Sequence, residues 1–199
     1  MIGIVDYGAG NILSVKKALE YLGIDCKIIE SETDFKEVEK IILPGVGAFQ
    51  SAIQKLKFTG IHGIIKNWLL SNKPFLGICL GMQLLFEESE ESKDAEGFGI
   101  FKGKVIRFSN KKVPQIGWNQ VATTQASKIM KGIKRSSFFY FLHGYFVQPQ
   151  DDDIVVGITE YGVVYPSVIE KGNIYAVQFH PEKSGEVGLK LIKNWIKKC

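Results

Sequence analysis

One cysteine of this chain lies in a context that is typical of a nucleophile. Cys79 stands in Gly77-Ile-Cys79-Leu-Gly81, directly after the apolar run 74–78. We predict a strand over that run and a helix over 80–88, so the thiol would stand on a tight turn between them. Glycine suits both flanking positions because a side chain there would collide with neighbouring backbone. The N-terminus of the helix would favour the thiolate form.

The alternative for Cys79 is a buried structural cysteine in a well-packed strand. The other two cysteines lack its context, because Cys26 lies within an apolar run and Cys199 ends the sequence. We expect both of these to be inert. Three cysteines are too few for a disulfide framework, so we expect a reducing, cytoplasmic location.

A cysteine nucleophile needs a base, and a histidine after another apolar run can supply it. His180 follows the predicted strand 174–178, and Glu182 stands two residues further on in His-Pro-Glu. The carboxylate can then hydrogen-bond the imidazole and fix its tautomer. Cys79, His180 and Glu182 together predict an enzyme that attacks a carbonyl and passes through a thioester. For His-Pro-Glu alone, a surface turn is the alternative.

The two other histidines are weaker candidates. His62 begins a helical stretch beside Gly63, and we expect it at the surface. His143 stands at the end of an aromatic run, where a position in a pocket and a structural position are both possible. No cysteines and histidines have the spacing of a metal site, and we predict neither a metal nor a cofactor.

Glycines after another predicted strand suggest a site for developing negative charge. Pro44-Gly45-Val46-Gly47 follows the run 40–43, and its N–H groups could form an oxyanion hole with the N–H of Leu80. An ordinary turn is the alternative. Tyr7-Gly-Ala-Gly10 could cradle a phosphate before a helix, but it lacks the full glycine pattern of a dinucleotide site.

The elements that must position these residues alternate between strand and helix in the first half of the chain. The sequence predicts strands at 2–6, 26–30, 40–43 and 74–78, and helices near 12–22, 48–56 and 61–70. After Gly97, β-rich segments follow at 104–108, 137–142, 154–159, 163–169 and 174–178, and a helix closes the chain over Gly185–Lys198. We predict an α/β fold, a single three-layer domain over 1–199. A mostly parallel central sheet would carry helices on both faces and a small antiparallel β extension.

Composition excludes several classes of protein. The chain has 199 residues, 45% hydrophobic and 23% charged, which excludes intrinsic disorder. The formal net charge is only +4 and no basic stripe is present, so we expect no nucleic-acid partner. No apolar run approaches the roughly 18 residues of a membrane span, and no signal peptide is evident, so we expect no membrane association.

The motifs resemble those of a known family, the class I (triad) glutamine amidotransferases. The resemblance runs nearly end to end, through Asp6-Tyr-Gly-Ala-Gly-Asn-Ile12, Leu43-Pro-Gly-Val-Gly-Ala-Phe49, the segment around Cys79, Gly117-Trp-Asn119 and Gln178-Phe-His-Pro-Glu-Lys-Ser184. It implies that Cys79 attacks the side-chain amide of glutamine while His180 moves the protons. Ammonia leaves, and water hydrolyses the glutamyl thioester to glutamate.

The resemblance also implies which residues bind glutamine. The matching positions are Gly47, Gln83, His143, Gly144 and Tyr145, with the backbone at 143–145 holding the amino-acid end of glutamine. The Gly45–Val46 peptide resembles an oxyanion strand that reorients when a partner is bound.

Within the family, the motifs are most similar to the branch that passes ammonia to a HisF-type (β/α)8-barrel cyclase subunit in histidine biosynthesis. Such a chain works as a heterodimer, and the positions that match its interface are Gly8, Gly10, Asn11, Trp118, Tyr140 and Lys183. Two residues depart from the usual pattern. In the loop 113–119, Gln115 stands where histidine is usual, and Gly144 stands where serine or threonine is usual.

Because both departures fall near substrate or partner segments, a paralogous branch is the alternative. It would supply ammonia to a different synthase, such as one that forms amidino sugars for surface glycans. A degenerate amidotransferase that only scaffolds a partner is a further possibility, as is a cysteine peptidase or esterase. The complete set of Cys79, His180 and Glu182 argues against a scaffold, and no segment suggests a peptide groove.

Overall fold

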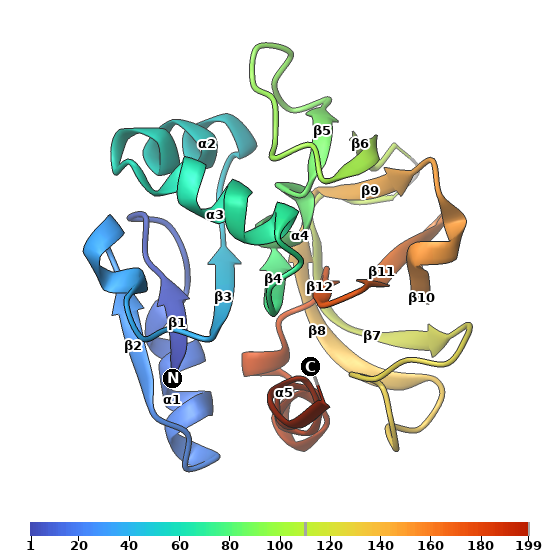
Figure 1. The fold of residues 1–199 in the computed structure, drawn as a ribbon. Coiled ribbons are helices and arrows are strands. Elements are labelled where there is room, and N and C mark those ends of the chain that lie inside the picture. Colours follow the sequence, from blue (N-terminus) through green and yellow to red (C-terminus); the bar gives the residue numbers. More distant parts are fainter. Residues whose placement is uncertain (110, 199) are drawn as a thin grey trace.

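The structure is a computed structural model that describes residues 1–109 and 111–198, and a nine-stranded mixed sheet runs through it (Figure 1). The first five strands are parallel, and in spatial order they are β2 (Cys26–Ile29), β1 (Ile2–Val5), β3 (Lys40–Gly45), β4 (Phe75–Cys79) and β12 (Ile174–Val177). The other four are antiparallel, and they are β11 (Val164–Lys171), β10 (Val155–Glu160), β7 (Gln115–Thr123) and β8 (Ser137–His143).

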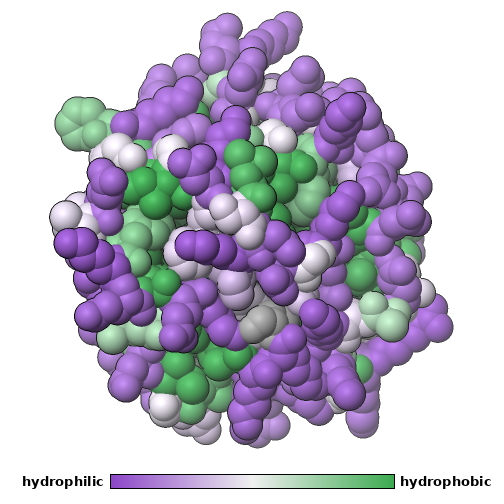
Figure 2. Space-filling model, viewed as in Figure 1, coloured by the Kyte–Doolittle hydropathy of each residue, from purple (hydrophilic) through white to green (hydrophobic). Residues whose placement is uncertain are grey.

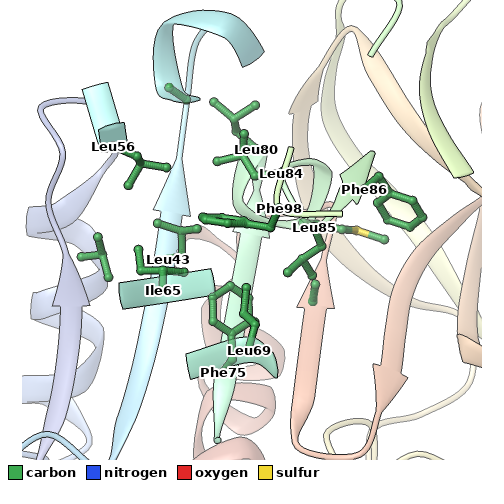
Figure 3. Packing of buried hydrophobic residues seen from close by; sticks show 14 of the residues in the cluster. Leu43, Leu56, Ile65, Leu69, Phe75, Leu80, Leu84, Leu85, Phe86 and Phe98 are labelled. Atoms are coloured by element: carbon green, nitrogen blue, oxygen red, sulfur yellow. The ribbon is translucent and has the colours of Figure 1, made fainter. Parts of the chain in front are cut away.

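Two pairs of helices cover opposite faces of the parallel strands. The helices α2 (Phe49–Phe58) and α3 (Ile61–Leu70) pack on one face, and α1 (Ile12–Tyr21) and α5 (Gly185–Lys198) pack on the other. Successive residues of a strand point to opposite faces. Leu43 of β3 therefore packs with α2 and α3 (Figure 3), whereas its neighbour Ile42 belongs to the core under α1 and α5. The predicted three-layer α/β arrangement is confirmed.

A separate three-stranded sheet stands beside the main one. It consists of β5 (Phe86–Ser89), β6 (Phe101–Arg107) and β9 (Tyr145–Pro149), with β5 parallel and β9 antiparallel to the central β6. The antiparallel part of the molecule therefore comprises four strands of the main sheet in addition to this second sheet. The predicted antiparallel extension is present, and it also contains β7 and β9, which the sequence does not indicate as strands.

The helix predicted over 80–88 is wrong beyond its first turn. The helix α4 covers only Leu80–Gln83, and the chain then enters β5. Leu84, Leu85 and Phe86 are all fully buried, which one face of a helix cannot accommodate. The N–H of Phe98 also donates to the carbonyl of Leu84, which a continuing helix would need for itself.

The loop predicted over 113–119 is wrong as well, because β7 begins at Gln115. In β7 and β8, Gln115 pairs with His143 and Trp118 with Tyr140. Trp118 is exposed, as is Ile116 two residues before it. Because large apolar side chains face solvent here, the segment lacks the usual pattern of a half-buried strand, and only its pairing with a distant strand defines it.

Hydrophilic side chains cover most of the face shown in Figure 2. Among the described residues, no helix is both long and apolar enough to cross a membrane. Within the same part of the chain, no three histidine, cysteine or acidic side chains form a group that could hold a metal ion.

Candidate active site

The predicted nucleophile and base meet at the carboxyl ends of adjacent strands. Cys79 ends β4 and His180 follows β12, the parallel neighbour of β4. On the other side of β4, Gly45 ends β3 and is the register partner of Cys79. In open α/β sheets this edge is where ligands bind, because loops there leave a crevice. Residues far apart in the sequence are therefore brought together where the fold favours a site.

The turn at Cys79 is strained and depends on glycine. Cys79 has φ +55° and ψ −106°, a conformation that residues other than glycine seldom adopt. A Cβ on Gly81 would lie 1.9 Å from the carbonyl oxygen of Leu43, and a Cβ on Gly77 would lie 2.7 Å from that of Gly81. The turn predicted from the glycine spacing is confirmed, together with the close backbone approach that requires it.

The side chains of His180 and Glu182 form a buried pair. The imidazole Nδ1 is 2.8 Å from the carboxylate Oε1, and the two side chains are 2% and 1% exposed. The other ring nitrogen, Nε2, is buried and has no hydrogen-bond partner among the described residues, and the charge of a Cys79 thiolate would act on the imidazole from nearby. Because a carboxylate only accepts, it holds the proton of the neutral ring on Nδ1 and leaves Nε2 as the base.

The surroundings of His180 favour its protonated form. Burial disfavours the imidazolium, but the negative charge of a Cys79 thiolate and the Glu182 carboxylate outweigh this effect and raise the pKa of His180 to about 10. The imidazole can therefore accept the thiol proton when Cys79 acts as a nucleophile. This is the activation that a cysteine nucleophile needs.

A residue that sequence reasoning missed also contacts the sulfur. Gln178 is fully buried, and its Nε2 donates to Cys79 Sγ over 3.7 Å. The thiol in turn lies 3.7 Å from the carbonyl oxygen of Leu142, to which it can donate. Gln178 stood in the sequence as a member of the His-Pro-Glu motif, and its one available signal was a polar side chain at the end of an apolar run.

Gln83 and His143 brace the same backbone carbonyl. The Nε2 of Gln83 donates to the carbonyl oxygen of Tyr145 over 3.0 Å and to Gln178 Oε1 over 3.2 Å. His143 Nδ1 lies 2.8 Å from the same carbonyl, which must accept the proton from the ring. Burial lowers the pKa of His143 to about 4, so its imidazole is neutral at pH 7.

Gln115 lies behind His143, away from the exposed surface. Its side chain is buried, and its Oε1 accepts a hydrogen bond of 2.9 Å from the hydroxyl of Tyr165. That hydroxyl also lies 3.3 Å from His143 Nε2. Gln115 therefore reaches the site through Tyr165 and His143. At the other departure from the family pattern, a Cβ on Gly144 would lie 3.1 Å from Val113 Cγ1, so a serine would require a small shift of Val113.

A cavity of about 140 Å³ opens beside the sulfur of Cys79. It is lined by Val46, Gly47, Cys79, Leu80, Gln83, Leu142 and His143. Five of these residues are among those expected in the oxyanion hole or the glutamine site, namely Val46, Gly47, Leu80, Gln83 and His143. Gly45 lies behind them in β3, and Tyr145 contributes its carbonyl to the bracing of Gln83 and His143.

Comparison with known proteins agrees with this geometry. The family model described as glutamine amidotransferase class-I matches residues 3–199. The chain belongs to this family. Two solved structures share the fold of the amidotransferase at low sequence identity. One is a glutamine amidotransferase, with a TM-score of 0.79, 18% identity and coverage of 98% of this chain and 97% of that chain. The other is PurLQS from Thermotoga maritima, with a TM-score of 0.73 and 22% identity. That match covers 98% of this chain and 96% of the PurLQS chain.

Curated relatives are more similar in sequence. Proteins named imidazole glycerol phosphate synthase subunit HisH from Caldanaerobacter subterraneus subsp. tengcongensis and Pyrococcus furiosus are each 50% identical to the amidotransferase, over 98% of this chain and 97% of theirs. One from Methanocaldococcus jannaschii is also 50% identical and covers 98% of both chains.

The predicted partner positions fall into two groups. Trp118 is 57% exposed, its ring centroid lies 6.2 Å from that of Tyr140, and Lys183 Nζ stands 5.9 Å from the centre of the Tyr140 ring. The other group, Gly8, Gly10 and Asn11, forms the loop between β1 and α1. Packing connects the two groups. The 3-10 turn Pro181–Lys183, which holds Lys183, packs against α1, the helix that directly follows Asn11.

Three other expectations concern residues outside this site. The N–H of Gly8 donates to the Asp6 carboxylate over 2.8 Å and is thus not available to a phosphate. His62 lies only partly at the surface, because its ring is half-buried and stacks on Phe98 with centroids 4.9 Å apart. Cys26 is half-buried in β2, and Cys199 lies outside the described residues.

Proposed function

We propose that this amidotransferase is a HisH-type glutaminase subunit of imidazole glycerol phosphate synthase, which hydrolyses glutamine to glutamate and ammonia for histidine biosynthesis. The observation that carries the chemistry is the buried His180–Glu182 pair beside Cys79 on its strained turn. The relatives that carry this subunit name, each 50% identical over 98% of the chain, support the pathway.

In the first half of the reaction His180 takes the thiol proton and Cys79 Sγ attacks the amide carbon of glutamine. The carbon becomes tetrahedral, and its oxygen acquires negative charge. The N–H of Leu80 and an N–H from the Gly45–Val46 peptide would stabilise that oxygen, since both segments adjoin Cys79. His180 then returns the proton to the leaving nitrogen, so that the C–N bond breaks and ammonia departs.

In the second half water replaces ammonia. His180 removes a proton from the water, whose oxygen attacks the thioester carbon, and the same donors stabilise the second tetrahedral intermediate. The C–S bond breaks, glutamate leaves, and the thiol is restored. The contact of the imidazole with the buried carboxylate of Glu182 keeps the ring oriented in both halves of the reaction.

The cavity beside Cys79 is the proposed glutamine site. Gly47 and Gln83 line it directly, and the backbone of His143, Gly144 and Tyr145 would hold the amino and carboxylate groups of the substrate. Since Gln83 and His143 both hydrogen-bond the carbonyl of Tyr145, they fix the backbone on which that recognition depends.

The proposed partner is a HisF-type (β/α)8-barrel cyclase that receives the ammonia. Its docking surface would consist of Trp118, Tyr140 and Lys183 with the loop that holds Gly8, Gly10 and Asn11. Exposed aromatic side chains are typical anchors of protein interfaces, and Phe138 and Ile116 on the same two strands enlarge the apolar area here.

A paralogue that serves another synthase is the alternative, and the two departures from the family pattern bear on it. Gln115 is only 3% exposed, and its contact with Tyr165 turns it away from the aromatic surface. Gly144 adjoins Val113 rather than Trp118 or Tyr140. Because neither residue belongs to the docking surface, neither favours a different partner.

The test measures glutamate release by the purified chain alone, with a HisF-type cyclase, and with the cyclase plus its ribotide ligand. We expect release to increase when both are present. If the cyclase neither binds the chain nor stimulates hydrolysis, the proposed pathway is wrong. If no condition yields glutamate, the proposed chemistry is wrong.

A further inference from the structure

The hydroxyl of Tyr7 is buried near the candidate active site, and the mechanism above does not use it. Tyr7 follows β1 and is 3% exposed. Among the described residues its Oη has no hydrogen-bond partner. Burial of an unpaired hydroxyl costs folding free energy, and native proteins pair nearly all such groups. A hydroxyl left unpaired at this place can donate to a partner that another state of the site provides.

The hydroxyl lies against Gly45, the register partner of the nucleophile. A Cβ on Gly45 would lie 2.5 Å from Tyr7 Oη and 2.8 Å from the Cβ of Leu80. The Tyr7 hydroxyl thus lies against Gly45 at the end of β3, close to where the start of α4 also approaches Gly45. Burial raises the pKa of Tyr7, and the negative charge of Cys79 raises it further. The phenol therefore stays protonated and can donate a hydrogen bond.

The order of the strands defines what this donor can reach. In the sheet β3 lies between β1 and β4, so Tyr7 follows the strand on one side of Gly45 and Cys79 ends the strand on the other side. A trans peptide directs its N–H and its carbonyl in opposite directions. If the N–H of the Gly45–Val46 peptide points toward Cys79, the carbonyl of Gly45 points away from Cys79, toward β1, the strand that Tyr7 follows.

The far end of the same segment is held independently. Glu91 accepts a hydrogen bond of 2.7 Å from the N–H of Phe49, the first residue of α2. Between these two positions, Val46 and Gly47 are exposed, and Gly47 has φ +99°. The short segment 45–47 is therefore anchored by α2 at one end and adjoins the Tyr7 hydroxyl at the other.

We propose that Tyr7 is a positioning residue, whose hydroxyl donates a hydrogen bond to the carbonyl of Gly45 when the Gly45–Val46 N–H turns toward the oxyanion. The inference rests on the proposed glutaminase function. Tyr7 does not touch the substrate, but it stabilises the arrangement of the peptide that binds the developing charge. Its effect should appear only in steps that create an oxyanion.

The test compares Tyr7→Phe with the wild-type chain in complex with a HisF-type cyclase and its ligand. We expect kcat for glutamine hydrolysis to fall roughly 10- to 100-fold with KM unchanged, because the lost interaction acts in the transition state. The melting temperature should stay the same or rise, because the substitution removes an unpaired buried oxygen. Alkylation of Cys79 by iodoacetamide should keep its rate, since that reaction forms no oxyanion.

Tyr161→Phe is the matched control. Its hydroxyl donates to the carbonyl of Lys112 over 2.8 Å, outside the candidate active site, and we expect wild-type kcat from it. If Tyr7→Phe hydrolyses glutamine as fast as the active wild type, the inference is wrong and the proposed function stands. If kcat, the alkylation rate and the melting temperature all fall together, Tyr7 has only a structural role. A wild-type complex without glutaminase activity would overturn the proposed function itself.

Discussion

His180 Nδ1 and Glu182 Oε1 lie 2.8 Å apart in a site where both side chains are almost completely buried. The carboxylate has little water around it to screen its charge, and this charge contributes to the raised pKa of His180. Orientation and protonation of the base therefore depend on a residue that is only two positions away along the chain.

Replacing Glu182 with glutamine removes the charge at nearly constant shape. We expect the pKa of His180 to fall, because burial then acts with less opposition, and glutamine hydrolysis to fall about 10²- to 10⁴-fold. NMR titration of the His180 ring and steady-state glutamate release measure the two effects. A His180 pKa that does not change would contradict this role of Glu182.

Replacing Cys79 with serine tests the covalent step. We expect glutamate release to fall at least about 1,000-fold, because the thioester can no longer form. The melting temperature of the variant shows whether the fold is retained. Cys26→Ser, in β2, is the control and should leave hydrolysis unchanged. Substantial hydrolysis by Cys79→Ser would rule out Cys79 as the nucleophile.

Replacing Gly81 with alanine tests the close packing under the turn. The new Cβ would lie 1.9 Å from the carbonyl oxygen of Leu43, so backbone must move. We expect a loss of about 2 kcal/mol or more in unfolding free energy and a loss of glutaminase activity. Urea unfolding measures the change in unfolding free energy, and glutamate release measures the activity.

Gly63→Ala is the matched control for that substitution. Gly63 is exposed within α3, and a Cβ there would meet nothing within 4 Å. Alanine should stabilise this helix by up to about 1 kcal/mol. Equal effects of the two substitutions would contradict the requirement for glycine at position 81.

The neutral state of His143 predicts a dependence of stability on pH. Its pKa is about 4 in the folded chain, below the ordinary value of 6.5. Between these values the unfolded chain binds a proton that the folded chain does not, so the stability present above pH 6.5 is lost as the pH falls toward 4. The contribution is about 1.4 kcal/mol per pH unit.

Replacing His143 with glutamine removes the titrating imidazole and so isolates its contribution to the pH dependence of stability. We expect the wild type to lose about 2–3 kcal/mol more than the variant between pH 6.5 and 4.5. Urea unfolding at the two pH values measures the difference, in which other titrating groups cancel. If both proteins lost the same free energy, His143 would not be the buried neutral group that the structure describes.

The sequence could predict the parts of the site that depend on neighbours along the chain. The glycines around Cys79 indicate a turn because steric constraints act over a few residues, and His180 and Glu182 are close in sequence as well as in space. The contact of Gln178 with Cys79 spans 99 residues, and Tyr7 meets Gly45 through the order of the strands. Such pairs carry no local pattern.

The same distinction explains the errors in the predicted elements. The segment 80–88 has the composition of a helix, but the distant residue Phe98 takes the carbonyl of Leu84 and ends α4 early. Likewise β7 is defined by its pairing with β8 rather than by its own residues. Local propensity gives way where long-range hydrogen bonds are available.

Labelling with a glutamine analogue that carries an electrophile in place of the side-chain amide tests the central claim most directly. The complex with a HisF-type cyclase and its ligand is incubated with the analogue, digested and analysed by mass spectrometry. The proposed function predicts one label per chain on the peptide that contains Cys79, and its loss when glutamine is added in excess. A label on Cys26 instead, or no label on the folded complex, would contradict a glutaminase built on Cys79.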